Sequence, residues 1–518
     1  MAPQSKVGRC ERAGRPCSVY GEAAVMTVQS LTDLQRRLDP DWLADQPEAD
    51  TESVIVVLPS HSLGGSLLSH YVQRIPALEH RYLVAYLSLH RLPNCEIVYL
   101  CSQAPNPEVL DYYASLIPNS DAKSARSRFH CVAVDDGTAR STSAKLLDRP
   151  DLLHSLRASF RGRPVHIQPW NVTDLEVEVA LQLQAPLLGP SPELSPLAYK
   201  SSGRRLLAAA GVPVPFGRED VRSVDEIIGS IADVLAARPH APGVVVKHDN
   251  SCSGDGNAVI ELLNADQESA TMQEIRGRVE QLPDWYVSDL GAGGVVEELI
   301  TATTLRSPSV QVQISPPGEV SVLATHEQVL GGDNGQVFMG CDFPADPRYA
   351  QEIARYGKAV GRELATRGAV GRFGIDFAVA CGTGGHCEVY ALEINLRNGG
   401  TTHPYTVLCN LVPGRYDAEA GQWVSVNGSP RSYCATDNMV DPAWIGLPPA
   451  EVIAAVDAAG LQFDEASKTG VVLHMLSCLA IDGRFGLTAI GRTPRRAKQL
   501  FEATRKAVDG RGGTAATR

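Results

Sequence analysis

The sequence predicts a chain of several domains that combines α/β and α+β architecture, and three observations support this. The chain has 518 residues, which exceeds the usual size of one domain and favours two to four. Residues 27–195 alternate strand-like apolar runs with helical stretches, the order that is typical of βαβ units and a parallel sheet. Residues 371–397 instead place two alternating strands next to each other across a glycine-rich loop, which predicts an antiparallel hairpin.

The composition fits an ordinary globular protein and argues against two classes of partner. Hydrophobic residues make up 44% of the chain and charged residues 20%, which are usual values for globular domains. The formal net charge of −12 argues against a nucleic-acid-binding protein, for which a basic footprint is expected. The sequence contains no apolar run of about 18 residues, so we expect neither a membrane span nor a membrane partner.

The cysteines and the first residues indicate a cytoplasmic protein. The chain has 12 cysteines and no Cys-x-x-Cys pair, so we expect neither a zinc site nor a disulfide scaffold, but mostly reduced, buried thiols. Residues 1–26 are polar and lack the apolar stretch of a secretory signal. We expect a disordered leader there, with translation beginning at Met1 or at Met26.

Residues 27–195 are expected to form a Rossmann-like domain. Apolar runs predict strands at 53–59, 96–102, 128–136 and 164–170. Helices are predicted between them, at 63–74, 79–90, 107–117 and 145–160. The glycine pattern of dinucleotide sites does not follow the first strand, where "HSLGGS" is only weakly similar to it. A proline-rich segment at 187–196 marks the end of this domain.

Two lysines precede turns or loops that suit a phosphate. Lys200 opens a predicted helix that ends at Gly211, and taken alone it is better explained by a solvated lysine. Lys247 ends a β-branched strand and is followed by a loop that contains Ser253, Gly254 and Gly256. The backbone N–H groups of such a loop can approach a polyanion closely. The alternative is a glycine-rich hairpin with an exposed lysine.

Two further segments carry acids at strand ends. Glu297 and Glu298 end an apolar run, where they are either solvated or accept hydrogen bonds from an amino group such as that of adenine.

In the hairpin at 371–397, alternation places Glu393, Asn395 and Arg397 on one face. The loop length brings Asp376 opposite Leu392 or Glu393, and the sequence does not fix which. These oxygens suit Mg²⁺; the alternative is a solvated outer face of the hairpin.

These segments, in this order, resemble the ATP-grasp superfamily, whose members hold a nucleotide between two α+β lobes. The resemblance implies ATP and Mg²⁺ or Mn²⁺ as cofactors, with metal ligands Asp376, Glu393 and Asn395. It assigns nucleotide contacts to Lys200, Lys247, Ser253, Gly254, Gly256, Glu297, Glu298 and Ile300.

The segments "RSPSVQVQI", "EINLRNGGTTHP" and "YCATDN" further resemble the ATP-grasp peptide ligases of the pheganomycin type, over about residues 50–508. This resemblance implies a Rossmann-like pre-ATP-grasp domain at 27–195, a two-lobed ATP-grasp domain at 196–428, and a small C-terminal α+β domain at 429–518 with a disordered tail. It implies an ATP-dependent carboxylate–amine ligase that forms an amide through an acyl phosphate and releases ADP and phosphate. The substrates would be an amino-acid carboxylate and the amine of an amino acid or peptide, as in peptide natural-product biosynthesis.

Four residues after or beside the hairpin are implied in catalysis, namely Arg397, Arg306, Gly399 and Gly400. Two positions depart from the family pattern. The acid that many relatives use to hold ribose is Thr304 here, and an arginine that some relatives carry before the metal aspartate is Gly374. Arg397 and Arg306 are therefore expected to supply that charge. The alternatives are an ATP-grasp small-molecule kinase and a non-catalytic ATP-binding regulatory module.

Overall fold

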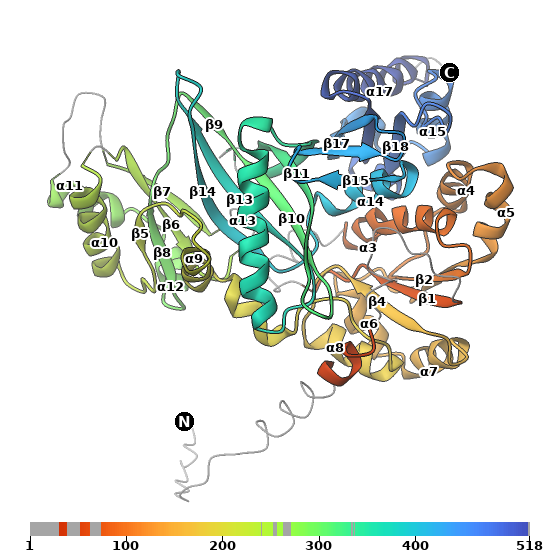
Figure 1. Cartoon of the computed structure of the whole chain (residues 1–518), viewed down its shortest axis with the longest axis horizontal. Helices are drawn as coiled ribbons and strands as arrows, with labels where there is room; N and C mark the ends of the chain where they lie inside the picture. The colour runs from red at the N-terminus through yellow and green to blue at the C-terminus, as the bar shows by residue number, and fades with distance from the viewer. Residues whose placement is uncertain are drawn as a thin grey trace, which may run out of the picture.

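The computed structural model describes residues 31–38, 52–62, 74–239, 241–251, 256–262, 271–332, 335 and 337–515. Within these residues the strands form three sheets, with helices packed around them (Figure 1). The mixed α/β and α+β class expected from the sequence is confirmed. Ser253, Gly254, the leader at 1–26 and nearly all of the predicted helix at 63–74 lie outside the described residues.

The N-terminal sheet is parallel, with strand order β3-β2-β1-β4. Its strands are β1 (Ser53–Leu58), β2 (Cys95–Cys101), β3 (Phe129–Ala133) and β4 (Val165–Pro169). All six residues of β1 are buried, as expected for a central strand that helices cover on both faces. The helices are α3 (Ile75–Glu79), η2 (His80–His90), α4 (Pro107–Ser115), α5 (Asn119–Ser127), α6 (Thr142–Leu147), α7 (Pro150–Ser159) and α8 (Asp174–Leu183).

A second, four-stranded sheet has the order β5-β8-β6-β7 and is antiparallel. Its strands are β5 (Gly217–Arg218), β6 (Gly243–His248), β7 (Asn257–Glu261) and β8 (Gly294–Glu298). The helices of this part are η3 (Pro192–Ala198), α9 (Lys200–Ala209), α10 (Val224–Ala237), α11 (Met272–Val279) and α12 (Asp284–Leu290). Valines of β6 and isoleucines of α10 share one core.

The third sheet has eleven strands and forms the centre of the molecule. Its strands are β9 (Thr304–Arg306), β10 (Pro308–Ile314), β11 (Val320–Gly331), β12 (Val337–Phe343), β13 (Gly371–Cys381), β14 (Cys387–Asn395), β15 (Gly414–Asp417), β16 (Gln422–Ser425), β17 (Pro430–Val440), β18 (Gly470–His474) and β19 (Arg484–Gly491). The helices are α13 (Pro347–Thr366), α14 (Thr402–Leu411), η4 (Pro442–Trp444), α15 (Pro449–Ala458), η5 (Leu476–Cys478), α16 (Leu479–Asp482) and α17 (Pro494–Ala515).

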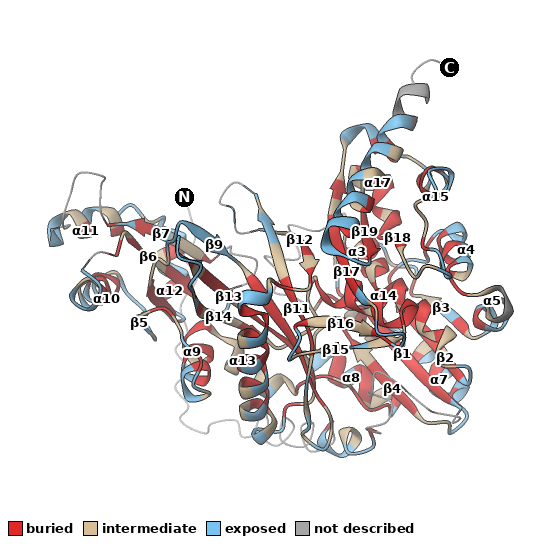
Figure 2. Ribbon diagram, turned by 45° about the horizontal axis from the view of Figure 1, so that its top comes forward, coloured by how far each residue is buried: buried red, intermediate tan, exposed pale blue. Residues whose placement is uncertain are grey.

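The long helix α13 crosses this sheet at close range (Figure 1). A Cβ atom at Gly357 would lie 2.8 Å from Val310 Cγ1, and one at Gly361 would lie 2.5 Å from Val320 Cγ1. Two glycines on one face of α13 therefore permit the close approach. Figure 2 shows the resulting pattern, in which the strands of the central sheet are largely buried and exposed residues follow the outer side of the helix.

The central sheet continues through the predicted boundary at residue 428. Strand β17 begins at Pro430 and pairs with β12 and β16, which precede the boundary, and with β19, which follows it. Strands from the predicted catalytic and C-terminal domains therefore share one sheet, and the boundary itself stays a prediction. Helix α17 runs to Ala515, beyond the helix predicted at 494–508. Among the described helices, none combines the length and the apolar character that a membrane crossing requires.

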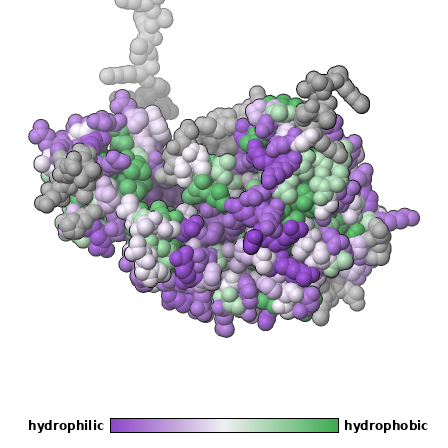
Figure 3. Space-filling model, turned by 90° about the horizontal axis from the view of Figure 1, so that it is seen from above, coloured by the Kyte–Doolittle hydropathy of each residue, from purple (hydrophilic) through white to green (hydrophobic). Residues whose placement is uncertain are grey.

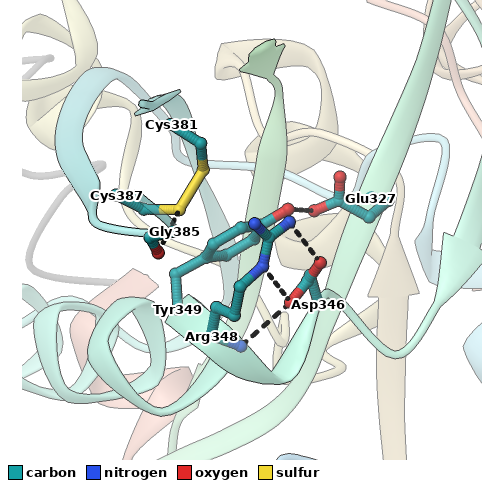
Figure 4. The surroundings of a disulfide bond; sticks show 7 residues. All are labelled: Glu327, Asp346, Arg348, Tyr349, Cys381, Gly385 and Cys387. Carbon is teal, nitrogen blue, oxygen red and sulfur yellow. Dashed lines mark hydrogen bonds and ion pairs between the residues drawn. A yellow bond between two sulfur atoms is a disulfide. The ribbon is translucent and has the colours of Figure 1, made fainter. Parts of the chain in front are cut away.

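One disulfide, between Cys381 and Cys387, differs from the expectation that no disulfide pattern is present (Figure 4). The two cysteines end β13 and begin β14, where they are direct cross-strand partners, so the hairpin brings their side chains within bonding reach. Sequence spacing alone did not reveal this pairing. The other seven cysteines among the described residues are free, and six of these are buried.

Candidate active site

A cavity of about 1140 Å³ opens where the three sheets approach one another. It is lined by residues of the second sheet, by the β13–β14 hairpin, and by segments of the N-terminal and C-terminal parts of the chain. Twelve residues that the sequence analysis singled out line it, namely Lys200, Lys247, Glu297, Glu298, Ile300, Arg306, Asp376, Glu393, Asn395, Arg397, Gly399 and Gly400. The fold thus brings together residues that lie about 200 positions apart in the sequence.

The hairpin register brings the three predicted metal ligands together. Asp376 pairs directly with Glu393, and a bulge follows Asp376. The Nδ2 atom of Asn395 donates to Asp376 Oδ2 at 3.0 Å and to Glu393 Oε1 at 3.4 Å. Of the two registers left open by the sequence, the structure has the one that pairs Asp376 with Glu393. Asp376 also accepts a 2.6 Å hydrogen bond from Gln328 Nε2.

The two carboxyl groups of this cluster differ in their protonation behaviour. Burial, together with the nearby charge of Glu393, raises the pKa of Asp376 to about 7. Burial also acts to raise the pKa of Glu393, but the ammonium group of Lys200 outweighs it and lowers that pKa to about 2. Because the two carboxyl groups are buried and close together, the ionised Glu393 disfavours ionisation of Asp376.

Both predicted lysines are buried, so the alternative of solvated lysines is wrong. Lys200 is 8% exposed and Lys247 is 7% exposed. Lys200 Nζ lies 2.5 Å from Glu393 Oε2 and also donates to the backbone oxygen of Ser251 at 3.2 Å. Lys247 Nζ lies 2.5 Å from Glu297 Oε2. Each lysine therefore reaches the cavity wall with a carboxylate partner.

Glu297 and Glu298 are also paired with other groups rather than solvated. Glu297 is 2% exposed and pairs with Lys247 and, at 2.7 Å, with Arg204 Nη1. Although burial opposes it, these two cations lower the pKa of Glu297. Glu298 accepts a 2.7 Å hydrogen bond from the backbone N–H of Phe216 and pairs with Arg238 at 3.2 Å. The pair therefore fixes strand β8, whose end borders the cavity.

The loop after Lys247 is described only at its ends. Gly256 is buried, and a Cβ atom there would lie 2.4 Å from Ser251 Cβ. Its carbonyl oxygen accepts hydrogen bonds from the backbone N–H of His248 and from Tyr286 Oη, both at 3.0 Å. Gly256 lies behind the described cavity wall rather than in it. It closes the base of the loop.

The segment after β14 forms a tight turn. The guanidinium group of Arg397 lies 5.1 Å from the ring centre of Trp170 and donates to the Asn398 backbone oxygen. The N–H of Gly399 donates to Thr402 Oγ1 at 2.9 Å, so it is committed within the turn rather than turned to the cavity. A Cβ atom at Gly400 would lie 2.4 Å from Phe338 Cε1, so a larger residue there would require the Phe338 ring to move. Arg306 lies exposed on β9 at the cavity wall.

A buried network at the cavity wall, to which Arg81 and Asp437 contribute, was missed by sequence reasoning. Asp437 Oδ1 accepts from His403 Nε2 and from His474 Nε2, each at 2.8 Å, and Asp437 Oδ2 pairs with Arg81 Nε at 3.1 Å. Burial lowers the pKa of His403 to about 3, so this residue is a neutral, structural hydrogen-bond donor. Asp437 lies within the quoted segment "YCATDN", but no local pattern indicates its partners, which come from η2, α14 and β18.

Comparisons with known proteins agree with this fold. The sequence model of the IQCH-like ATP-grasp family matches residues 192–286 and 280–419, and that of the PGM1 C-terminal domain matches residues 451–504. Residues 192–419 are thus similar in sequence to ATP-grasp proteins. The overall fold is similar to that of the biotin carboxylase–β,γ-ATP complex from Campylobacter jejuni. That structure aligns over 88% of this chain and 91% of its own, with a TM-score of 0.51 and 13% identity.

A second solved structure has a similar fold, and two further proteins are similar in sequence. The biotin carboxylase domain of Hydrogenobacter thermophilus 2-oxoglutarate carboxylase, in complex with MgADP, ADP and bicarbonate, aligns over 88% of this chain and 89% of its own with a TM-score of 0.51 and 12% identity. L-propargylglycine–L-glutamate ligase from Streptantibioticus cattleyicolor is 29% identical over 443 residues, 82% of this chain and 88% of that protein. IQ motif-containing protein H from Danio rerio is 23% identical over 357 residues, and this chain spans 34% of its length. The expected class, an ATP-grasp enzyme that ligates a carboxylate to an amine, is confirmed.

Proposed function

We propose that this ATP-grasp ligase activates the carboxylate of an amino acid with ATP and joins it to the amine of a second amino acid or of a peptide. The observation that carries the proposal is the cluster of Asp376, Glu393 and Asn395, with Lys200 Nζ 2.5 Å from Glu393. This cluster lies in a cavity large enough for a nucleotide and further substrates. The ligase from Streptantibioticus cattleyicolor is named for two amino acids, which supports substrates of this class in a peptide natural-product pathway.

The residues of the cluster fit a hard divalent cation. Two carboxylates and one amide converge, which is a donor set suited to Mg²⁺ or Mn²⁺. Burial and the neighbouring Glu393 carboxylate raise the pKa of Asp376, and a bound cation would oppose both effects. Asp376, Glu393 and Asn395 would hold it, and when bound it supplies charge that neutralises phosphate oxygens of ATP.

The nucleotide contacts are assigned to the second sheet. Lys200 and Lys247 reach the cavity from different elements and are proposed to hold phosphate oxygens. Glu298 and the backbone of Ile300 border the same part of the cavity, where adenine is proposed to bind. Glu297 positions Lys247 through their buried ion pair. In this part of the cavity the two lysines offer positive charge for phosphates, and Val245, Leu299 and Ile300 offer an apolar wall for a base.

The reaction balances in two steps. A carboxylate oxygen of the donor attacks the γ-phosphorus of ATP, the bond from that phosphorus to the β,γ-bridging oxygen breaks, and ADP leaves. The amine nitrogen of the acceptor then attacks the acyl carbon, the carbon–oxygen bond to phosphate breaks, and the nitrogen loses a proton as the amide forms. Arg397 is proposed to orient the donor carboxylate, because its planar fork matches a carboxylate. Arg306 adds positive charge at the cavity wall, and Gly399 and Gly400 shape the turn that positions Arg397.

The proposal is tested by removing one carboxylate of the cluster. Glu393→Gln keeps the size of the side chain but removes the charge that Lys200 and the cation would share. We expect donor-dependent ADP release to fall at least about 1000-fold. The matched control is Glu388→Gln on the same strand, where the side chain is exposed and contacts Tyr390, and it should keep wild-type activity. ADP release that survives in Glu393→Gln would contradict the assignment.

A further inference from the structure

The cavity has a second part that the nucleotide does not account for. Its volume of about 1140 Å³ exceeds the range of about 300–1000 Å³ that single small-molecule ligands usually fill. Away from the lysines of the second sheet, the wall is formed by the N-terminal and C-terminal parts of the chain. Four arginines lie in this wall, namely Arg74, Arg81, Arg397 and Arg484.

These arginines form one continuous group. His61 also lines the cavity. Besides burial, the positive charges of both Arg81 and Arg397 lower the pKa of its imidazole. Arg81 pairs with Asp437, and the neighbouring Asn438 accepts a hydrogen bond from Arg484. Arg484 and Arg74 then meet at a single carboxylate, that of Asp482.

The charges of this group do not cancel. Asp482 Oδ2 lies 3.0 Å from Arg74 Nε and 3.1 Å from Arg484 Nε, so two guanidinium groups share one carboxylate. Arg81 has Asp437 as its own partner. Arg397 stacks on Trp170 and has no ion pair with any residue that the structure describes. The wall therefore carries two positive charges more than the carboxylates that pair with it.

We propose that this arginine-lined part of the cavity holds the acceptor through a carboxylate of its own, which binds Arg74 and Arg484. The proposal rests on the function proposed above. With the donor carboxylate held by Arg397 beside the metal cluster, the acceptor amine approaches from the side away from ATP. Guanidinium forks bind carboxylates with two parallel hydrogen bonds. The acceptor is accordingly an amino acid with a free carboxylate, or a short peptide that presents one near its amine.

Arg74 and Arg484 can be tested one at a time because they share Asp482. In Arg484→Gln the carboxylate of Asp482 keeps Arg74, and in Arg74→Gln it keeps Arg484, so neither variant leaves Asp482 unpaired. Arg484→Lys retains the charge but loses the fork. The control is Arg505→Gln, since Arg505 is also in the C-terminal part of the chain but lies outside the cavity, on α17.

Two assays separate acceptor binding from donor activation. Hydroxylamine replaces the acceptor in the first assay, where ADP release and hydroxamate formation report activation of the donor alone. The second assay uses free L-amino acids as acceptors and compares each with its α-carboxamide. We expect Arg484→Gln and Arg74→Gln to keep wild-type hydroxamate formation and to raise the KM for the free amino acid at least tenfold with little change in kcat. Arg484→Lys should recover part of the loss.

The outcomes that overturn the proposal are distinct from failure of the ligase function. Equal use of amino acids and their carboxamides by the wild-type enzyme, or an unchanged KM in both glutamine variants, contradicts a carboxylate anchor in the acceptor. A parallel fall in hydroxamate formation assigns the two arginines to the donor instead. A wild-type enzyme that forms no hydroxamate with any amino-acid donor contradicts the ligase function itself.

Discussion

Single residues on the side of the cavity formed by the second sheet are coupled through buried charges. Glu297 compensates two cations, Lys247 and Arg204, and almost none of its surface is exposed. Arg204 has a second partner in Glu219 at 2.8 Å, whereas Glu297 is the ion-pair partner that the structure shows for Lys247. Removing Glu297 therefore leaves a buried ammonium group without its carboxylate.

We predict that Glu297→Gln lowers the free energy of unfolding by about 3 kcal/mol, because breaking a buried pair by removing one partner leaves an uncompensated charge. Urea denaturation measures the change. Glu280→Gln serves as the control, since the Arg276–Glu280 pair is exposed and such pairs contribute less than about 1 kcal/mol. Equal stability losses in the two variants would contradict the account of this network.

At the same scale, local sequence predicted the hairpin cluster but missed the residues beside it. Alternation along one strand places Glu393 and Asn395 on a common face, and the loop length limits their partner to a few positions around Asp376. Asp437 and Arg81 have no such signal. They are 356 positions apart, and only the packing of η2 against α14 and β18 brings them into contact.

Among the elements, α13 shows how a glycine can be required by packing rather than by backbone conformation. Gly361 faces Val320 and Val312 of the sheet, and an added Cβ would lie 2.5 Å and 3.3 Å from their methyl groups. Valine side chains have little freedom to move away. On α11, by contrast, a Cβ at Gly277 would meet nothing within 4 Å.

The same substitution should therefore have opposite effects at the two helices. Gly361→Ala is expected to lower the free energy of unfolding by about 1–3 kcal/mol through overpacking. Gly277→Ala is expected to raise it by up to about 1 kcal/mol, because alanine favours the helix and meets no neighbour. Thermal or urea unfolding of both variants provides the comparison. A stabilising effect of Gly361→Ala would show that α13 does not pack this closely.

Elements with a strong periodic pattern were predicted well, and their long-range pairing was not. Strands β1 and β2 consist mostly of consecutive apolar residues, so their class follows from sequence. The continuation of the central sheet from β12 into β17 depends on pairing between Asp342 and Cys434 and their neighbours, which no local signal specifies. The Cys381–Cys387 disulfide was missed for a similar reason, because the cross-strand register decides it.

At the scale of the whole molecule, several neutral histidines are buried in different cores. Burial lowers the pKa of His326 to about 3, and it lowers the pKa values of His80 and His166 to about 4. These values lie below the ordinary value of 6.5. The histidines therefore contribute stability that is complete above about pH 6.5 and is lost as the pH falls towards about 4.

We predict that the free energy of unfolding decreases between about pH 7 and about pH 5. His326→Gln should make this decrease shallower, because one buried group no longer has to take up a proton on unfolding. Urea denaturation at several pH values measures both slopes. A free energy of unfolding that stays constant over this range would contradict the prediction.

The three sheets together create the cavity, and no one of them contains the site. Lys200 and Lys247 belong to the part around the second sheet, Glu393 to the central sheet, and Arg74 to the N-terminal part. The polar side chains that cover much of the face in Figure 3 do not by themselves mark this site. The resemblance of the sequence to ATP-grasp ligases predicted the nucleotide half, whereas the arginine-lined half required the structure.

The central claim is that one ATP is consumed for each amide formed. The most direct test measures this ratio for each pair in a panel of amino-acid donors and acceptors. Mass spectrometry quantifies ADP and amide, and a phosphate assay of the same sample quantifies free phosphate. We predict equal amounts of ADP, free phosphate and amide product. Accumulation of a phosphorylated donor without an amide, which a small-molecule kinase would give, would contradict the claim.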